Sequence, residues 1–411
     1  MAWKMKDSGI EWIGEIPEGW EIVPVRSCFD EVRTKNTDGQ EQNALQFKSG
    51  NIISKTNFNA SMDDYVADTI TNYTVVLPDT VMINGLNLNY DFKSLRVALV
   101  KEKGVITSAY LAIFPDRKKI FPQYATYLFK GYETKMAFHN MGAGIRKTLG
   151  YKEFKNQPLL LPSKEEQNKI SAYLDSKCSH IDIMLSKIRS SIEEYKKLKQ
   201  AVITQAVTTL NCPNVKLKYL MDIIVDCPHE TPIYTFTGNY LVIRTSDQSL
   251  ASLRCDEYMY RLDEAEYKKR TRRLTLDKDD IVYGREGSWG LACLVPQSNK
   301  YCLGQRVMQF RCNTRLLYPK YAMYALNSET VYMQGALDTI GSTAPHVNIS
   351  TICNYLLPVP ALTEQKEITN YLDAKCAEID RLIAKKEQLV KELESYKKSL
   401  IYEVVTGKRE V

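Results

Sequence analysis

Two groups of polar loops carry the residues of this chain that could recognise another molecule. Asn and Gln side chains pair with adenine edges, Arg with guanine, and Glu or Asp with cytosine, while Lys and Arg neutralise phosphates. In the first half these residues are Lys48, Asn51, Asn84, Asn87, Asn89, Lys93, Arg146 and Lys147. In the second half they are Arg244, Lys269, Arg270, Arg272, Arg273, Arg285, Glu286, Ser288, Gln305, Arg306, Ser342, Thr343 and His346. Any polar loop contains such residue types, but their occurrence at matching places in both halves favours DNA binding.

No catalytic residue is predicted, because each catalytic motif that we sought is incomplete. A methyltransferase needs a glycine-rich cofactor loop and an Asn/Asp-Pro-Pro-aromatic motif, and Gly142-Ala143-Gly144 lacks the third glycine and the preceding strand. The glycines within Gly284–Gly290 form no phosphate-binding loop, since no Gly-Lys-Ser/Thr follows them. A nuclease set built from Pro115-Asp116 and Glu153–Lys155 is widely separated and is not repeated in the second half.

The cysteines and histidines predict no metal site. The 10 Cys form no C-x-x-C pair, and Cys227-x-His229 has no second pair at zinc-finger spacing. This usage is typical of a reducing compartment, where Cys behaves as a small hydrophobic residue. The first seven residues contain no apolar signal-peptide core, and no run has the apolar length of a membrane span. We therefore expect a cytoplasmic protein that binds no metal.

The elements that must position these loops form a repeat. Glu166–Thr208 aligns without a gap on Glu364–Thr406, and neither stretch contains Pro or Gly. Apolar residues recur at alternating steps of three and four, which predicts two long helices that pair as a coiled coil. The predicted seam comprises Ile181, Met184, Ile188, Tyr195, Leu198, Val202, Ile379, Leu382, Leu389, Leu393, Tyr396 and Leu400. Two amphipathic helices, each packed on its own domain, are the alternative.

The segments outside these helices predict two α+β heads that are distant copies of each other. Val81–Gly85 resembles Ile281–Gly284, and Pro122–Tyr127 aligns with Pro319–Tyr324, whereas the residues between these anchors diverge. The short link Thr209–Lys216 keeps the second head at the far end of the first helix, which favours an antiparallel helix pair. The predicted fold class is α+β, with two similar heads joined by an antiparallel coiled coil.

The chain of 411 residues is long enough for two or three globular units. We predict an N-terminal arm with the first head at 1–160, a spacer helix at 161–210, the second head at 211–358 and a second spacer helix at 359–411. Lys and Arg number 55 against 49 Asp and Glu, so any basic footprint must be local.

Three motifs give the sequence a resemblance to the specificity subunits of type I restriction–modification enzymes. The motif near the N-terminus is Trp12-Ile13-Gly14-x-Ile16-Pro17-x-Gly19-Trp20, and the motif near the C-terminus is Val404-Val405-Thr406-Gly407-Lys408. Pro162-x-x-x-Glu166-Gln167-x-x-Ile170-x-x-Tyr173-Leu174-Asp175 occurs once in each copy of the repeat. The first copy departs from the closing motif, because Val207-Thr208-Thr209 lacks the Gly-Lys pair.

The resemblance implies two target-recognition domains that each read one half of a bipartite site in double-stranded DNA, held apart by the helices. It also implies two modification subunits that bind S-adenosylmethionine, and restriction subunits that use ATP and Mg²⁺. This chain would itself bind no cofactor and catalyse no reaction. The competing hypotheses are a self-contained DNA-modifying enzyme and a coiled-coil adaptor that binds only proteins.

Overall fold

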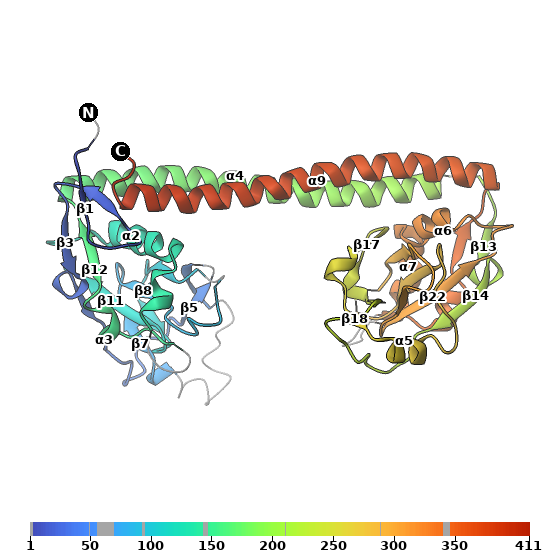
Figure 1. Cartoon of the computed structure of the whole chain (residues 1–411), viewed down its shortest axis with the longest axis horizontal. Coiled ribbons are helices and arrows are strands. Elements are labelled where there is room, and N and C mark those ends of the chain that lie inside the picture. The colour runs from blue at the N-terminus through green and yellow to red at the C-terminus, as the bar shows by residue number, and fades with distance from the viewer. Residues whose placement is uncertain are drawn as a thin grey trace. The chain divides into compact units, whose positions relative to one another are not determined.

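The structure is a computed structural model of the chain. It describes residues 3–48, 50–55, 70–92, 95–142, 147–209, 211–287, 289–339 and 346–411. The chain forms two compact units, of which unit 1 contains Met1–Ile188 with Gln388–Val411 and unit 2 contains Arg189–Glu387. Each unit therefore holds one head and part of both long helices, α4 (Lys164–Thr208) and α9 (Leu362–Val405) (Figure 1).

Head 1 (Glu21–Leu161) is built on a four-stranded antiparallel sheet with the order β4-β11-β8-β9. Three smaller strand pairs are also described in head 1, β3 with β12, β5 with β6 and β7 with β10. The elements of unit 1 before α4 are β1 (Met5–Asp7), β2 (Glu15–Pro17), β3 (Glu21–Pro24), η1 (Val25–Ser27), β4 (Phe29–Glu31), β5 (Leu45–Lys48), β6 (Asn51–Ser54), β7 (Thr74–Val76), β8 (Val81–Ile83), β9 (Val97–Leu99), β10 (Gly104–Ile106), β11 (Leu111–Pro115), α2 (Pro122–Thr134), η2 (Ala137–Asn140), α3 (Tyr151–Phe154) and β12 (Pro158–Leu161).

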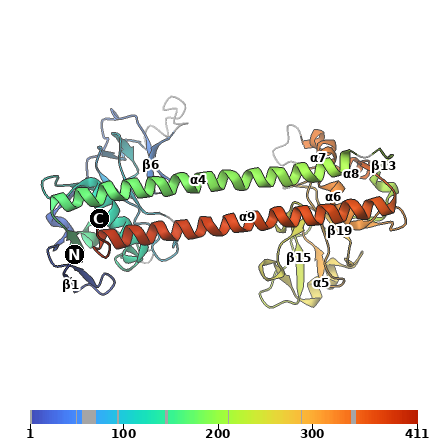
Figure 2. The same ribbon diagram turned by 90° about the horizontal axis from the view of Figure 1, so that it is seen from above.

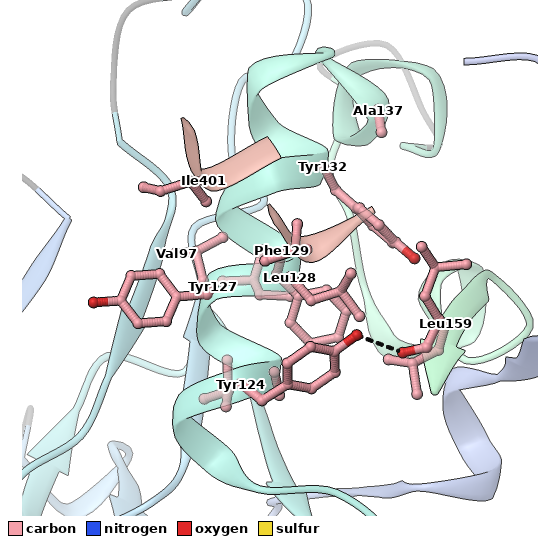
Figure 3. Packing of buried hydrophobic residues seen from close by; sticks show 14 of the residues in the cluster. Val97, Tyr124, Tyr127, Leu128, Phe129, Tyr132, Ala137, Leu159 and Ile401 are labelled. Atoms are coloured by element: carbon pink, nitrogen blue, oxygen red, sulfur yellow. Dashed lines mark hydrogen bonds between the residues drawn. The ribbon is translucent and has the colours of Figure 1, made fainter. Parts of the chain in front are cut away.

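Helix α2 supplies the aromatic core of head 1. It begins at Pro122, whose fixed φ suits the first helical position. Tyr124, Phe129 and Tyr132 are fully buried, and Ile401 of α9 joins the same cluster (Figure 3). The hydroxyl of Tyr124 donates to the carbonyl oxygen of Leu160 at 3.0 Å, so this buried polar group is paired.

Head 2 (Asn214–Pro358) repeats the sheet order as β14-β22-β19-β20. Helix α6 begins at Pro319, and the hydroxyl of Tyr321 donates to the carbonyl oxygen of Pro358 at 2.9 Å, as Tyr124 does in head 1. The elements are β13 (Asn214–Lys216), η3 (Leu217–Tyr219), β14 (Met221–Asp226), β15 (Tyr240–Ile243), η4 (Thr245–Asp247), β16 (Gln248–Ser249), β17 (Ser252–Leu253), η5 (Asp256–Tyr258), β18 (Arg261–Leu262), α5 (Glu264–Arg270), β19 (Ile281–Gly284), β20 (Ala292–Leu294), β21 (Tyr301–Leu303), β22 (Val307–Cys312), α6 (Pro319–Leu326), α7 (Glu329–Ala336), η6 (Leu337–Thr339), α8 (Ile349–Cys353) and β23 (Leu356–Pro358).

Within each unit, α4 and α9 lie side by side and run in opposite directions (Figure 2). Lys199 of α4 donates to both carboxylate oxygens of Asp380 in unit 2, at 2.9 and 2.8 Å. The repeat-equivalent residues, Lys397 and Asp182, make the same contact in unit 1 at 2.6 and 2.7 Å. The predicted α+β fold with two long antiparallel helices is therefore confirmed.

The helix pair buries a stripe of side chains that is partly displaced from the predicted seam. Leu185 is 5% exposed, whereas its predicted neighbour Met184 is 44% exposed. Both residues satisfy steps of three and four, and a shift of one position turns a side chain by about 100°. Ile181, Ile379 and Leu400 are buried, and Ile188, Tyr195, Val202, Leu382 and Leu393 are half-buried. The exposed members are Met184, Leu198, Leu389 and Tyr396, while Leu185, Ile192, Lys199 and Ile203 are buried.

The N-terminal arm, formed by β1 and β2, lies against the end of α9 in unit 1. The hydroxyl of Tyr402 donates to the carbonyl oxygen of Trp12 at 2.7 Å, and the ammonium of Lys408 donates to that of Ile13. Gly407 has a φ of +69°, and a Cβ there would lie 2.2 Å from Cδ of Pro17. The end of α4 leads instead into β13, which accounts for the missing Gly-Lys pair after Val207.

Candidate nucleic-acid interface

In head 1, a buried arginine holds the asparagine-bearing loop that follows β8. The guanidinium of Arg96 donates to the carbonyl oxygens of Asn84 at 2.8 Å and Leu86 at 2.9 Å, and also to that of Asp91. Its rigid fork of donors thereby fixes three points of one loop. The exposed Asn87 has a φ of +51°, a conformation that asparagine tolerates better than most residues. The loop is therefore held in one shape while Asn87 faces solvent.

The segment around Lys147 is joined to this loop through the backbone. The N–H of Leu149 donates to the carbonyl oxygen of Gly85 at 2.9 Å, and that of Leu88 donates to Lys147 at 3.1 Å. A Cβ on Gly85 would lie 2.5 Å from the carbonyl oxygen of Leu149, so this close approach requires glycine. Two groups of candidate residues that are distant in sequence thus become neighbours.

The β5–β6 hairpin adds Lys48 and Asn51, which pair across its turn. Gly50 in this turn has a φ of +72°, and a Cβ there would lie 2.9 Å from Cβ of Leu95, the residue before Arg96. The hairpin turn therefore lies beside the arginine-held loop. We name as surface 1 the described candidates of head 1, which are Lys48, Asn51, Asn84, Asn87, Asn89 and Lys147.

In head 2, ion pairs hold the loop that follows β19. Arg285 is buried, and its guanidinium contacts Asp226 at 3.1 Å and Glu286 at 3.0 Å. Glu286 also lies 3.8 Å from the guanidinium of Arg306, which is largely exposed. The predicted reader Arg285 is thus occupied inside the head, whereas its neighbour Arg306 faces solvent.

The loop after β19 is joined to the segment around His346 as its counterpart is joined in head 1. The N–H of Val347 donates to the carbonyl oxygen of Arg285 at 3.0 Å, and Glu286 and His346 form an antiparallel bridge. In both heads, the bond joins two equivalent segments. One is the loop that follows β8 or β19, and the other lies before the last strand of the head, β12 or β23. The two heads therefore assemble their candidate loops in the same way.

The remaining candidates of head 2 gather around residues 228–236. Lys269 pairs with Glu230 at 2.6 Å, and the side-chain amide of Gln305 donates to Thr231 at 3.2 Å. Arg244 makes a two-point contact with Asp247, with both distances at 2.8 Å, and its guanidinium lies 3.8 Å from the ring centroid of Tyr260.

Arg270 differs in its position from the other cations of the basic segment Lys268–Arg273. It is buried and donates to the carbonyl oxygens of Leu303 at 3.1 Å and Glu230 at 3.0 Å, which is at odds with the predicted DNA contact. Arg272 and Arg273 are exposed. We name as surface 2 the exposed and half-buried candidates of head 2, which are Arg244, Lys269, Arg272, Arg273, Glu286, Gln305, Arg306 and His346.

Five predicted contacts, Lys93, Arg146, Ser288, Ser342 and Thr343, lie outside the described residues. The sequence motifs do not indicate the acidic partners that hold the loops, Asp226 and Glu133. Glu133 accepts the backbone N–H of Arg96 at 2.6 Å, and burial raises its pKa from 4.5 to about 7. Neither residue lies near its partner in sequence, so only an alignment of co-varying positions could have indicated the pairing.

No group of three or more His, Cys, Asp or Glu that could hold a metal ion occurs among the residues that the structure describes. Across the same residues, no helix combines the length and the apolar character needed to cross a membrane.

Comparison with known proteins gives consistent results. Residues 226–393 match the family model of the type I restriction modification DNA specificity domain. The putative type I restriction enzyme MjaX specificity subunit of Methanocaldococcus jannaschii is 22% identical over 96% of this chain and 95% of its own length. The type I restriction enzyme EcoBI specificity subunit of Escherichia coli is 26% identical over 32% of this chain and 27% of its own.

Solved structures show the same fold. One, described as the structural basis of complex assembly and conformational transition of the type I R-M system, has a TM-score of 0.68 at 16% identity and covers 96% of this chain and 99% of that one. The HsdS subunit from Thermoanaerobacter tengcongensis has a TM-score of 0.50 at 15% identity, covering 98% of this chain and 100% of that one.

Residues 226–393 therefore match a type I restriction modification DNA specificity domain, and the chain is similar over nearly its whole length to specificity subunits of type I restriction enzymes.

Proposed function

We propose that head 1 and head 2 each read one half of a bipartite DNA site, through surface 1 and surface 2. The observation that carries this proposal is the repeated junction of loops, in which Leu149 bonds to Gly85 and Val347 bonds to Arg285. Equivalent backbone frames with different side chains suit two readers of different sequences. Asn87 would contact an adenine edge, whereas Arg306 would contact guanine or a phosphate.

The long helices would hold the heads and dock two modification subunits. Leu198 and Tyr396 occupy equivalent repeat positions in different units and are exposed to 48% and 47%. Exposed apolar side chains at matching places suit two copies of one protein partner. In this proposal the partners bind S-adenosylmethionine, ATP and Mg²⁺, and the four segments 1–160, 161–210, 211–358 and 359–411 are the recognition and spacer modules.

Methylome sequencing of host cells tests half-site reading. The variant Asn87→Ala should relax or change one half of the methylated site, and Arg306→Ala should change the other half. Loss of one good base contact costs about 1–3 kcal/mol of discrimination, which is enough to make other bases acceptable. Lys118→Ala and Arg315→Ala are matched controls, because both exposed cations lie in the connection before α2 or α6.

Three outcomes separate the hypotheses. A change in one half for each variant, with unchanged controls, is the expected result. A simultaneous change of both halves by either variant would contradict independent heads. An unchanged site in both variants, together with weaker assembly of the partner subunits, would favour a protein-binding adaptor.

A further inference from the structure

Head 2 carries an exposed hydrophobic tip that the assignments above leave unused. The loop between β14 and β15 presents Phe236 at 102% of its reference exposure, together with Ile233 at 71%. Tyr234 packs beside Tyr260 at a centroid distance of 4.6 Å and supports the base of this tip. A fully exposed phenylalanine gains nothing from burial in the free protein, so it is suited to a contact that a partner completes.

The loop that bears this tip is anchored at several points. Its start is held by Arg270, which donates to the carbonyl oxygen of Glu230 at 3.0 Å, and by Gln305, which donates to Thr231 at 3.2 Å. In its middle, the N–H of Thr235 donates to the carbonyl oxygen of Arg261 at 2.9 Å. A Cβ on Gly238 would lie 2.0 Å from the carbonyl oxygen of Leu262, so the end of the loop lies tightly on β18. Phe236 therefore projects from a fixed base.

The cationic and aromatic side chains around the tip suit a ligand that carries several negative charges and flat apolar rings. Arg244 lies over the ring of Tyr260 at 3.8 Å, Arg254 lies 5.8 Å from the ring centroid of Tyr258, and Lys269 pairs with Glu230 at the start of the loop. The elements β18 and α5 lie on the side of head 2 away from α6 and the long helices (Figure 1). Proteins that unstack a base step in DNA insert an apolar side chain between the bases and place cationic side chains around it.

Head 1 has no such tip at the corresponding place. Its connection between β4 and β5 is a closed polar turn, in which the side-chain amide of Asn36 donates to the carbonyl oxygen of Glu41 at 2.9 Å and its side-chain oxygen accepts the N–H of Glu41 at 3.1 Å. Among the described residues 32–44 of this connection, head 1 therefore carries no counterpart of Phe236.

We propose that Phe236 inserts between stacked bases of bound DNA at or beside the half-site read by head 2, while Arg244 and Lys269 contact the flanking phosphates. The inference rests on the proposed function, since it assigns a contact to the same surface 2. Partial unstacking would make head 2 sensitive to the deformability of a base step that it does not read through hydrogen bonds.

The test uses the full chain assembled with its modification subunits and a duplex containing the site defined by methylome sequencing. 2-Aminopurine, whose fluorescence rises when it is unstacked, is placed at one position at a time through both half-sites and the gap. We expect a rise at one step in or next to the half-site of head 2 and none in that of head 1. Phe236→Ala should remove this signal and weaken binding about 10- to 100-fold, because one base–aromatic contact is lost.

Two further variants make the result decisive. Phe236→Leu keeps an apolar wedge and should retain most of the signal, whereas Tyr219→Ala, which removes an exposed aromatic ring elsewhere in head 2, should leave signal and affinity unchanged. Specific binding without any fluorescence change would overturn the wedge and leave half-site reading intact. Loss of subunit assembly in Phe236→Ala, with normal fluorescence in the complex that remains, would reassign the tip to a protein partner. Absence of any site-specific binding would overturn both proposals.

Discussion

The two heads are alike where they join the long helices and different where they present their candidate loops. At the joint of head 1, the buried side-chain amide of Gln167 accepts from the N–H of Phe121 at 2.8 Å and donates to two carbonyl oxygens. Gln365 makes the same three bonds in head 2, beginning with the N–H of Tyr318 at 2.7 Å. At the loops, by contrast, head 1 uses an arginine bonded to carbonyl oxygens and head 2 uses a chain of ion pairs.

This difference indicates which parts of a head are free to vary. The joint must fit a helix whose sequence is repeated, so its buried polar groups admit few other solutions. The loops need only a rigid frame, and carbonyl-bonded Arg96 and ion-paired Arg285 provide such a frame by unrelated contacts. Divergence of the loops therefore changes the presented side chains without disturbing the attachment.

The largest effect is expected at the joints. Gln167→Leu or Gln365→Leu leaves buried backbone groups without partners, so each should lower the free energy of unfolding of its own unit by about 2–5 kcal/mol. Hydrogen exchange measured by mass spectrometry locates the loss. The control Gln388→Leu removes an exposed hydrogen bond and should cost less than about 0.5 kcal/mol. Very unequal losses at the two joints would break the equivalence.

The next largest effect is expected at the two arginines that hold the candidate loops, Arg96 in head 1 and Arg285 in head 2. Arg96→Met should weaken binding to the half-site of head 1, and Arg285→Met should weaken binding to that of head 2, each about 10- to 100-fold. Both residues are buried, so they act by positioning Asn87 and Arg306. The measurement is binding to duplexes with one half-site scrambled. Equal loss on specific and unspecific DNA would show that the variants merely unfold the head.

The repeat, both long helices and their antiparallel pairing follow from the sequence, because a gap-free repeat with a three-and-four pattern leaves few arrangements. The sequence does not predict which residues form the buried stripe, since Met184 and Leu185 both fit the pattern. Lys199 also looks like a surface residue until Asp380 is placed beside it. The same limit applies to surface 2, where the roles of Arg270 and Arg285 depend on carbonyl and carboxylate groups from distant segments. Residue type predicts what a side chain can bind, but not which partner it already has.

A pH effect is expected in unit 1. Burial raises the pKa of Glu133 from 4.5 to about 7, so the folded state binds an extra proton between these values. The stabilising contribution is complete below pH 4.5 and is lost as the pH rises through about 7. Wild type should therefore lose about 3 kcal/mol relative to Glu133→Gln across this range, as measured by urea denaturation. A constant difference between the two proteins from acidic to neutral pH would contradict this assignment.

The smallest expected effect concerns two repeat-equivalent ion pairs, one in each unit. Lys199 and Lys397 are repeat-equivalent, as are Asp380 and Asp182, yet the side chain of Lys199 is 8% exposed and that of Lys397 is 27% exposed. Desolvation makes an unpaired ammonium costly, and this cost grows with burial. Both carboxylates are more than half exposed, which limits what either pair can contribute.

Asp380→Asn should therefore lower the free energy of unfolding by about 1–2 kcal/mol, and Asp182→Asn by no more than about 0.5 kcal/mol. Urea denaturation at low and high salt distinguishes the two, because screening reaches the more exposed pair in unit 1 more easily. Lys199→Leu provides the matched control, since it removes the buried charge together with the need for a partner and should be neutral or stabilising. If Lys199→Leu were as damaging as Asp380→Asn, the pair would be holding the helices in register, and the exposed carboxylate would matter more than its solvation predicts.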